Sequence, residues 1–311
     1  MNGLLVVDKP AGPTSHDVVA RARRALGERR IGHTGTLDPI ATGVLLLVLG
    51  RATRLARFLA AAEKAYEATI RLGFSTETCD AEGTPVGEFY QGPFPDRDAV
   101  DRALDAFRGT HPQQPPLFSA KKIAGRRSYE IARGRQRGGP GDPREDLATN
   151  SASAASNALP APVAVTAYDI RVVQCVHDTV TVRVHCSAGF YVRALAHDLG
   201  GALGTGAHLA SLRRTRCAGF GLDLALPLAA LEADPSGARS AVLSPAAMLS
   251  GLAAVTLTPE GVERVAHGRD VPIAEGVGST FVRLLDPSGD LVAVGEPAGV
   301  PGLLHPAVVL K

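Results

Sequence analysis

The 311-residue sequence lacks the features that mark secreted, membrane-spanning and metal-binding proteins. Its four cysteines, Cys79, Cys175, Cys186 and Cys217, form no Cys-x-x-Cys pair, which favours isolated thiols over a zinc site or a disulfide framework. No apolar run approaches the length that crosses a bilayer. The first residues show neither a basic segment nor a small-residue cleavage pattern, so we expect no signal peptide, no anchor and a cytoplasmic protein.

A strong net charge is also lacking, because the formal value is only +2, but the charge is unevenly distributed. Before Asp223 lie 28 of the 33 Lys and Arg residues but only 21 of the 31 Asp and Glu residues, a balance of +7. Separated clusters of cations suit a polyanion better than a small anion, whereas the alternative is a set of solvated helix faces. The clusters are Arg21, Arg23, Arg24, Arg29 and Arg30; Lys121, Lys122, Arg126, Arg127, Arg133, Arg135 and Arg137; and Arg213, Arg214 and Arg216.

Composition is otherwise ordinary for a globular protein, with 45% hydrophobic and 21% charged residues, and the length allows one large and one small domain. Residues 138–160 have no periodic apolar face and predict a flexible surface insertion. A shift to acidic composition with several prolines indicates a boundary between residues 230 and 245. Apolar runs at 281–285 and 291–294, joined by an Asp-Pro-Ser-Gly-Asp turn, predict a hairpin in a small β-rich domain over 240–311.

Hydrophobic periodicity predicts a mixed α and β chain. A helix capped by Ser15 should end at Gly27, and another should begin at Asp96. Further helices are expected at 51–62 and 190–203, and strands at 4–7, 44–49, 66–72, 163–176 and 179–186.

The loop at residues 30–43 is the most informative stretch of the chain. Its glycines, threonines and proline are too broken for a helix and too polar for a buried strand, so it predicts a shaped loop. Asp38 is its only carboxylate, His33 precedes it by five residues, and an apolar strand follows. Loops on a rigid scaffold often carry chemistry, although a plain connection into a buried strand has the same pattern.

Tyr66 and Arg193 are two further candidates for functional residues. Tyr66 lies near the start of a predicted strand, where its phenol could face a pocket or simply belong to the core. Arg193 lies in the first turn of a predicted helix, where a cation is poorly matched to the helix dipole. That mismatch argues for a specific anionic partner, although many such arginines are merely at the surface.

The loop Gly-His-Thr-Gly-Thr-Leu-Asp-Pro-Ile-Ala-Thr-Gly at 32–43 resembles the signature of bacterial tRNA pseudouridine-55 synthases. Other segments follow in that family's order over residues 3–230: 8–12, 64–66, 80–83, 115–122, 189–193 and 208–214. The resemblance implies an α+β fold, with a mixed, mostly antiparallel sheet and flanking helices. It also implies a catalytic domain over 1–230 and a C-terminal domain resembling a PUA domain.

The activity implied is isomerisation of uridine 55 in the tRNA T loop, in which the C1′–N1 bond breaks and a C1′–C5 bond forms. Such chemistry needs a carboxylate but no metal or cofactor. By the resemblance, Asp38 is that carboxylate, Arg193 pairs with it, and Tyr66 stacks on the base. Attack of Asp38 at C6, attack at C1′ and charge stabilisation alone all stay open.

The resemblance further implies base flipping by a monomeric enzyme that recognises the tRNA T arm. His33 would fill the space left by the extruded base, although it could instead bond within its own loop. The other RNA-binding candidates are Lys9, Lys64, Asp80, Lys121, Lys122, Tyr191, Arg213 and Arg214.

Some features depart from the family pattern. The insertion at 138–160 lies in a region expected to close over RNA, and Ala188 occupies a position that is often basic. The acidic C-terminal part should contribute little affinity of its own. An RNA-binding or RNA-folding module is an alternative function, whereas a phosphate cradle is disfavoured because the loop lacks the Gly-Lys-Ser/Thr ending.

Overall fold

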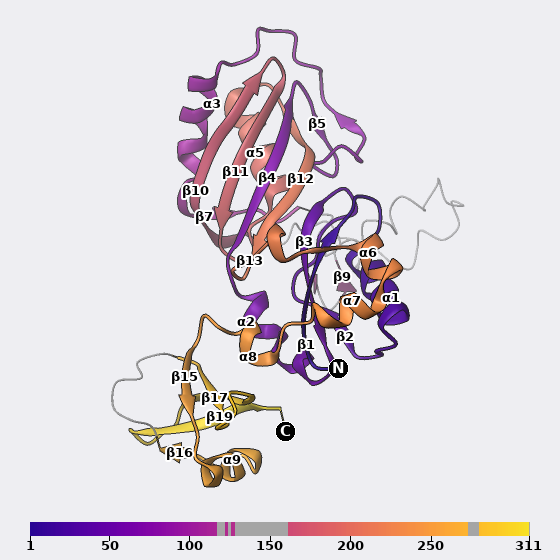
Figure 1. The fold of residues 1–311 in the computed structure, drawn as a ribbon. Helices are drawn as coiled ribbons and strands as arrows, with labels where there is room; N and C mark the ends of the chain where they lie inside the picture. The colour runs from indigo at the N-terminus through magenta and orange to yellow at the C-terminus, as the bar shows by residue number, and fades with distance from the viewer. Residues whose placement is uncertain (117–121, 124–125, 128–160, 273–279, 311) are drawn as a thin grey trace, which may run out of the picture. The chain divides into compact units, whose positions relative to one another are not determined.

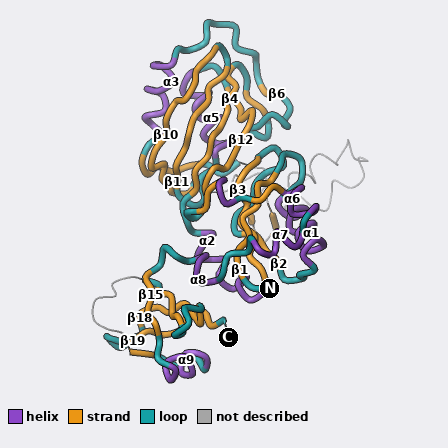
Figure 2. Tube along the Cα trace, viewed as in Figure 1, coloured by secondary structure: helices purple, strands orange, loops and turns teal. Residues whose placement is uncertain are grey.

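The computed structural model describes residues 1–116, 122–123, 126–127, 161–272 and 280–310. The chain divides into two compact units, one formed by Met1–Ala62 with Arg214–Lys311 and the other by Glu63–Arg213. Each unit contains β-strands and flanking helices (Figures 1 and 2).

The first part of unit 1 is built on the antiparallel pair β1 (Gly3–Lys9) and β3 (Thr42–Leu49). Both strands are buried along nearly their whole length, which explains their almost continuous apolar sequence. β2 (Ile31–His33) pairs with β3, and β14 (Leu226–Pro227) lies parallel to β1. The remaining elements here are α1 (Ser15–Leu26), η1 (Gly50–Leu55), α2 (Ala56–Ala60), β13 (Phe220–Gly221), η4 (Leu222–Leu224), α6 (Leu228–Ala233), α7 (Pro235–Ser240) and α8 (Pro245–Met248).

Helix α1 begins differently from the sequence prediction. Its N-cap is Thr14, not Ser15: the Thr14 hydroxyl accepts from the Asp17 amide, and the Asp17 carboxylate accepts from the Thr14 amide. The predicted Ser15 cap was therefore wrong. The Ser15 hydroxyl instead donates to the Leu37 carbonyl and accepts from the Leu37 amide. The predicted end at Gly27 is confirmed, with φ of 64° at that residue.

The C-terminal part of unit 1 holds a five-stranded sheet of order β15-β17-β18-β19-β16 with one helix, α9, beside it (Figure 2). The predicted hairpin is confirmed as the antiparallel pair β17 and β18. Val282, Leu284, Val292 and Leu304 form part of its own core. The bounds are β15 (Ala253–Thr256), α9 (Pro259–Ala266), β16 (Val271–Pro272), β17 (Val282–Leu285), β18 (Leu291–Pro297) and β19 (Leu303–Val309).

Unit 2 is a sheet of order β12-β4-β11-β10-β7, with α3 and α5 packed on it. Strand β12 continues from unit 2 into unit 1, because the boundary falls between Arg213 and Arg214. The bounds are β4 (Lys64–Leu72), β5 (Ser75–Thr76), β6 (Pro85–Val86), α3 (Arg97–Leu104), η2 (Asp105–Phe107), β7 (Gly109–Gln113), β8 (Lys122–Ile123), β9 (Arg126–Arg127), β10 (Val163–Val176), β11 (Thr179–Cys186), α5 (Val192–Leu203) and β12 (Ala207–Cys217).

The predicted fold class is confirmed: the sheets are mixed and mostly antiparallel, with flanking helices and a small β-rich C-terminal part. The strands predicted at 163–176 and 179–186 have those bounds, and Asp96 caps α3 as expected. Helix α5 starts two residues later than predicted, at Val192. The insertion predicted at 138–160 lies outside the described residues. None of the described helices is long and apolar enough to span a membrane.

Gly43 is predicted to be irreplaceable, because a Cβ there would lie 2.2 Å from the Arg214 carbonyl oxygen at a φ of 98°. Gly12 is a matched control, since its φ is 103° but a Cβ would meet nothing within 4 Å. Gly12→Ala should cost about 1–3 kcal/mol of unfolding free energy from backbone strain alone. Gly43→Ala should cost clearly more in the same denaturant titration, and equal losses would contradict the close approach.

Candidate active site

The loop between β2 and β3 presents Asp38 at the surface of unit 1. Asp38 is half-buried, whereas its neighbour Leu37 is buried and anchors the loop in the core. The Asp38 carbonyl accepts the Ala41 amide (3.0 Å), which closes a tight turn around Pro39. The backbone on both sides of Asp38 is thus fixed, which sets the position from which its side chain extends.

Two buried cations hold this loop by its carbonyl oxygens. Lys9, with 0% of its surface exposed, donates from Nζ to the carbonyls of Pro10 (3.0 Å), Pro39 (3.2 Å) and Ala41 (2.6 Å). Arg214 is 1% exposed and donates from Nε to the Val44 carbonyl (2.7 Å). Its other nitrogens reach the carbonyls of Gly35 (3.1 Å) and Thr36 (3.5 Å).

Burying such cations is costly, at several kcal/mol per ion, unless their donors are all matched. Hydrogen bonds from a charged donor contribute about 1.5–3 kcal/mol each, so three carbonyls per cation can offset the desolvation. The family resemblance predicted that Lys9 and Arg214 bind RNA phosphates. Their burial and their carbonyl partners favour a structural role instead, as supports of the Asp38 loop.

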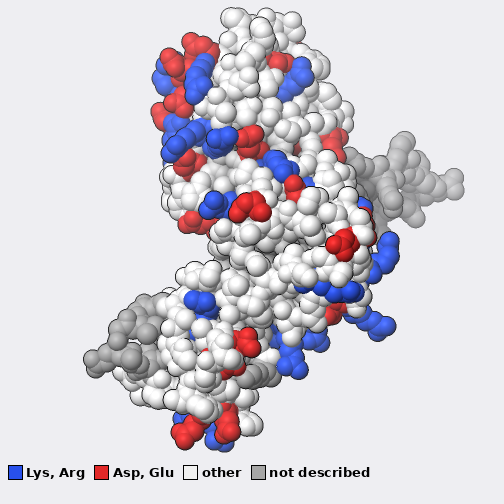
Figure 3. All heavy atoms as spheres, in the orientation of Figure 1, with Lys and Arg blue, Asp and Glu red and all other residues white. Residues whose placement is uncertain are grey.

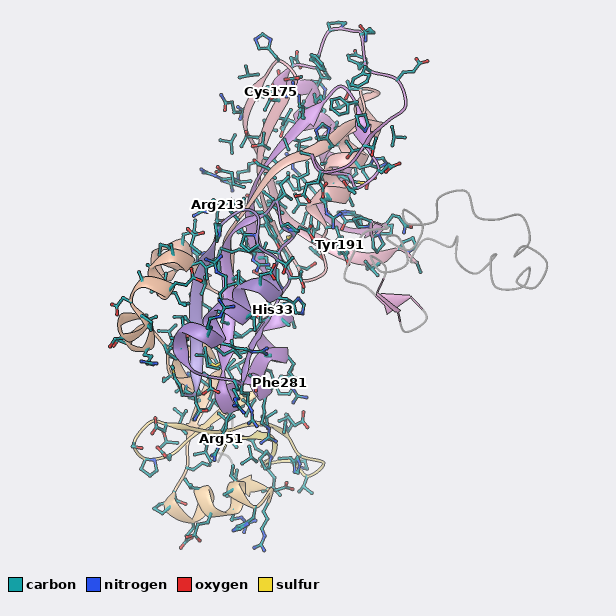
Figure 4. The ribbon with its side chains drawn as sticks, turned by 90° about the vertical axis from the view of Figure 1, so that its right-hand side faces the viewer. His33, Arg51, Cys175, Tyr191, Arg213 and Phe281 are labelled. Carbon is teal, nitrogen blue, oxygen red and sulfur yellow. The ribbon has the colours of Figure 1, made fainter. Side chains whose placement is uncertain are left out.

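His33 ends β2, opposite Leu47 of β3, and is half-buried. Its ring meets the ring of His16 from α1 edge-on, with centroids 5.2 Å apart. Figure 4 shows His33 at the edge of the unit 1 ribbons. Because both imidazoles are braced by secondary structure, His33 occupies a fixed position five residues before Asp38. Its predicted insertion into RNA stays a prediction.

In unit 2, Arg193 is the second residue of α5 and is only 6% exposed. Its Nη1 donates to the Thr78 carbonyl (3.0 Å) and lies 3.7 Å from an Asp80 carboxylate oxygen. The mismatch with the helix dipole is thereby compensated within unit 2, and the expected anionic partner there is Asp80. The implied pairing of Arg193 with Asp38 stays a prediction.

Asp80 was predicted to bind RNA, but it is buried in a tight turn of its own. Its Oδ1 accepts from the Thr78 hydroxyl (2.5 Å) and the Glu82 amide (3.1 Å), while its other oxygen faces Arg193. The backbone on both sides of it bonds to Leu209 of β12. Asp80 therefore positions the Arg193 guanidinium, and a direct RNA contact is not favoured by its burial.

Sequence reasoning missed Gln113, the last residue of β7. No side chain caps α5 at Tyr191, but the buried Gln113 amide group holds the backbone of this residue at the start of the helix. Its Oε1 accepts from the Tyr191 amide (2.8 Å), and its Nε2 donates to the Tyr191 carbonyl (3.0 Å). A single polar residue at the end of a strand carries no sequence signal for such a role, because its partner is 78 positions away.

Lys64 and Tyr66 lie on the same face of β4 as Ala68, Ile70 and Leu72, and both are buried, Tyr66 to 7% exposure. Lys64 faces Cys186 across the β4–β11 ladder. Burial raises the pKa of the Cys186 thiol to about 12, which disfavours the thiolate form that a nucleophilic cysteine needs. The alternation of β4 thus places Tyr66 on the covered face of the sheet. The strand predicted at 66–72 is confirmed, whereas the stacking of Tyr66 on a base stays a prediction.

For the remaining RNA-binding candidates, the structure gives a place in the chain but few contacts. Tyr191 and Arg213 are half-buried at the start of α5 and in β12. Lys121 lies outside the described residues, and Lys122 begins the short strand β8. Within the described part of the chain, no group of three His, Cys, Asp or Glu side chains is placed to hold a metal ion.

Two family models match this chain. Residues 23–139 match the TruB family pseudouridylate synthase N-terminal domain, and residues 193–245 match the tRNA pseudouridylate synthase B C-terminal domain. The matched stretches include the Asp38 loop, Tyr66, Asp80, Arg193 and Arg214.

Curated relatives match over the full length. A tRNA pseudouridine synthase B of Solibacter usitatus is 40% identical, with 100% of both chains covered. One from Gloeobacter violaceus is 43% identical and covers 100% of this chain and 99% of its own. Among solved structures, the crystal structure of a Cbf5-Nop10-Gar1 complex is similar with a TM-score of 0.72 and 27% identity, over 100% of this chain and 85% of the other.

Arg214→Lys should loosen the Asp38 loop, because the single nitrogen of a lysine cannot replace the three nitrogens of the planar guanidinium, each of which meets a different carbonyl here. We expect a loss of about 2–4 kcal/mol in unfolding free energy, because each unpaired buried carbonyl costs about 1–3 kcal/mol. Amide hydrogen exchange at residues 35–41 should accelerate. The exposed Arg216 on the same strand provides the control Arg216→Lys. Unchanged exchange in the loop would rule out the supporting role.

Asp80→Asn should destabilise unit 2, because it leaves the buried Arg193 guanidinium without the carboxylate it faces in that unit. The expected loss is about 3 kcal/mol of unfolding free energy. Asp178→Asn is the control, since Asp178 pairs with an exposed arginine, Arg71, at 2.8 Å and such pairs contribute about 0–1 kcal/mol. Equal losses for both variants in thermal or denaturant unfolding would count against the assignment.

Proposed function

The chain belongs to the TruB family and is a tRNA pseudouridine synthase, and from this premise we propose that its target is uridine 55 in the T loop. Full-length agreement with curated relatives supports the target, together with the signature loop around Asp38. The observation that carries the proposal is the position of Asp38 on a loop held by two buried cations. We also propose that the enzyme acts as a monomer in the cytoplasm and recognises the T arm.

The reaction is an isomerisation. The C1′–N1 glycosidic bond breaks, the uracil turns, and C1′ bonds to C5, while the proton of C5 is lost and N1 gains one. No atom is added and no electron is exchanged, so a carboxylate and a proton relay are enough. We assign the carboxylate to Asp38, whose backbone is fixed before RNA arrives and therefore needs little reorganisation.

We assign the roles that support Asp38 to two residues of unit 2, Tyr66 and Arg193. Tyr66 offers a flat phenol on a buried sheet face, suited to stacking on a uracil and to moving a proton. Arg193 offers a buried guanidinium whose orientation is set by Asp80 and Thr78, suited to keeping the catalytic carboxylate ionised. These residues together make catalysis the main role rather than RNA binding alone.

Access to the uridine requires extrusion of the base, because a stacked nucleotide inside a folded loop cannot reach a carboxylate. We assign His33 to the space that the base leaves. Its ring is braced by His16, so its insertion would cost little conformational entropy. A flat, half-buried imidazole at this position can stack between bases as the lost uracil did.

This division of labour predicts opposite effects for two substitutions. Asp38→Asn should abolish pseudouridine formation in an unmodified tRNA transcript, as mapped chemically at position 55, and leave the dissociation constant within about threefold. His33→Ala should instead weaken binding by about 1–3 kcal/mol, the value of one stacked base, and retain turnover at saturating enzyme. Pseudouridine formation by Asp38→Asn would refute the assignment of the carboxylate.

A further inference from the structure

Three arginines of unit 1, which we call the arginine row, lie on the segment formed by η1 and α2: Arg51, Arg54 and Arg57. The opposite side of this segment is apolar. Ala52, Leu55 and Leu59 are buried in a core that also contains residues of β18 and β19. Because the apolar side is fixed inward, the arginines at every third position are directed outward, and all three are exposed.

Contacts with the C-terminal part hold the row in place. Arg51 Nη1 donates to the Leu310 carbonyl (3.2 Å) and Arg54 Nη1 to the Val309 carbonyl (2.5 Å). The Arg57 guanidinium lies over the rings of Phe58 (4.8 Å) and Phe281 (6.0 Å). Figure 4 shows Arg51 and Phe281 in the same region of unit 1. Each contact engages only part of a guanidinium, so exposed donors remain on a fixed surface.

The row differs from other exposed arginines in its charge balance. Arg71, Arg171 and Arg183 of unit 2 each pair with a carboxylate, at 2.8 to 3.1 Å. Over α3 and β10, blue and red side chains are correspondingly mixed in Figure 3. No carboxylate of the described residues pairs with a member of the arginine row. Three exposed cations on one face, without neutralising partners, create a local positive potential.

The positive charge of the arginine row contrasts with the C-terminal part that it contacts. From Asp223 onward, the chain has five Lys and Arg residues against ten Asp and Glu residues. The arginine row therefore adds three cations from a different stretch of the sequence beside this acidic C-terminal part. A row of fixed guanidinium groups fits a ladder of phosphates, which present repeated single charges to bidentate donors.

The position of the row limits which phosphates it can meet. Strand β3 has 8 residues and joins the Asp38 loop at one end to η1 at the other. At about 3.3 Å per residue, the two ends are about 25 Å apart. An RNA that occupies Asp38 can reach the row only with a part well removed from the target nucleotide.

We propose that the arginine row binds backbone phosphates of the substrate tRNA outside the T arm. This inference rests on the proposed function, since it takes tRNA as the ligand. The row would add affinity without taking part in the chemistry, and its contribution would depend on salt, because binding releases condensed counterions.

The test compares the triple variant R51Q/R54Q/R57Q with a control of equal charge change, R71Q/R171Q/R183Q. Dissociation constants are measured for a full-length unmodified tRNA transcript and for an isolated T-arm hairpin, between 50 and 200 mM salt. We expect the row variant to bind full-length tRNA about tenfold more weakly, with a salt slope reduced by about 2–3. Its hairpin affinity and single-turnover rate on the hairpin should stay within twofold of wild type, as should the control on both RNAs.

A charge-preserving variant, R51K/R54K/R57K, separates charge from packing and should recover most of the affinity for full-length tRNA. Failure to recover it, with a lowered melting temperature, would show a packing role and overturn the proposal. Equal affinities of the row variant and the control for full-length tRNA would also overturn it. Absence of pseudouridine at position 55 with wild-type protein would instead overturn the proposed function, while the binding comparison would still stand.

Discussion

Burial of two cations beneath one loop is the constraint on which the catalytic part of unit 1 depends. Lys9 comes from the end of β1 and Arg214 from β12, and both donate hydrogen bonds to backbone carbonyls. An ionised group in the interior is tolerated only while its partners stay in place, so the loop cannot shift without exposing unmatched charge. The same requirement that stabilises the fold therefore fixes Asp38 for chemistry, and Gly43 makes room for it by letting the Arg214 backbone approach closely.

Arginine occurs in four different environments in this chain, and the difference explains how one residue type serves several purposes. Arg214 is buried, donates to backbone carbonyls and holds a loop in place. Arg193 is buried beside Asp80, which orients its guanidinium. Arg171 and Arg183 are exposed but neutralised by carboxylates. The arginine row is exposed, fixed and left positive. Since the desolvation and pairing of a guanidinium decide its function, a count of arginines in the sequence does not reveal which are available to RNA.

Local signals were sufficient for much of the secondary structure. The alternation in 163–176 and 179–186 placed β10 and β11 correctly, and Gly27 and Asp96 marked helix ends, because a cap or a period of two is written within a few residues. Thr14 and Ser15 are both good caps, and propensity could not choose between them. The choice depended on Leu37, whose backbone claims the Ser15 hydroxyl from 22 positions away.

The sequence by itself determined the family, the signature loop with Asp38, and the residues that alternate onto one face of β4. Those features are local, since each is contained in a short continuous stretch. Only the tertiary structure decided that Lys9 and Arg214 are buried supports and that Asp80 and Gln113 position the start of α5. It also decided that arginines from residues 51–57 contact the acidic C-terminal part. Each of these depends on partners far apart in the chain, and hydrogen bonding and desolvation are properties of the folded neighbourhood rather than of the residue type.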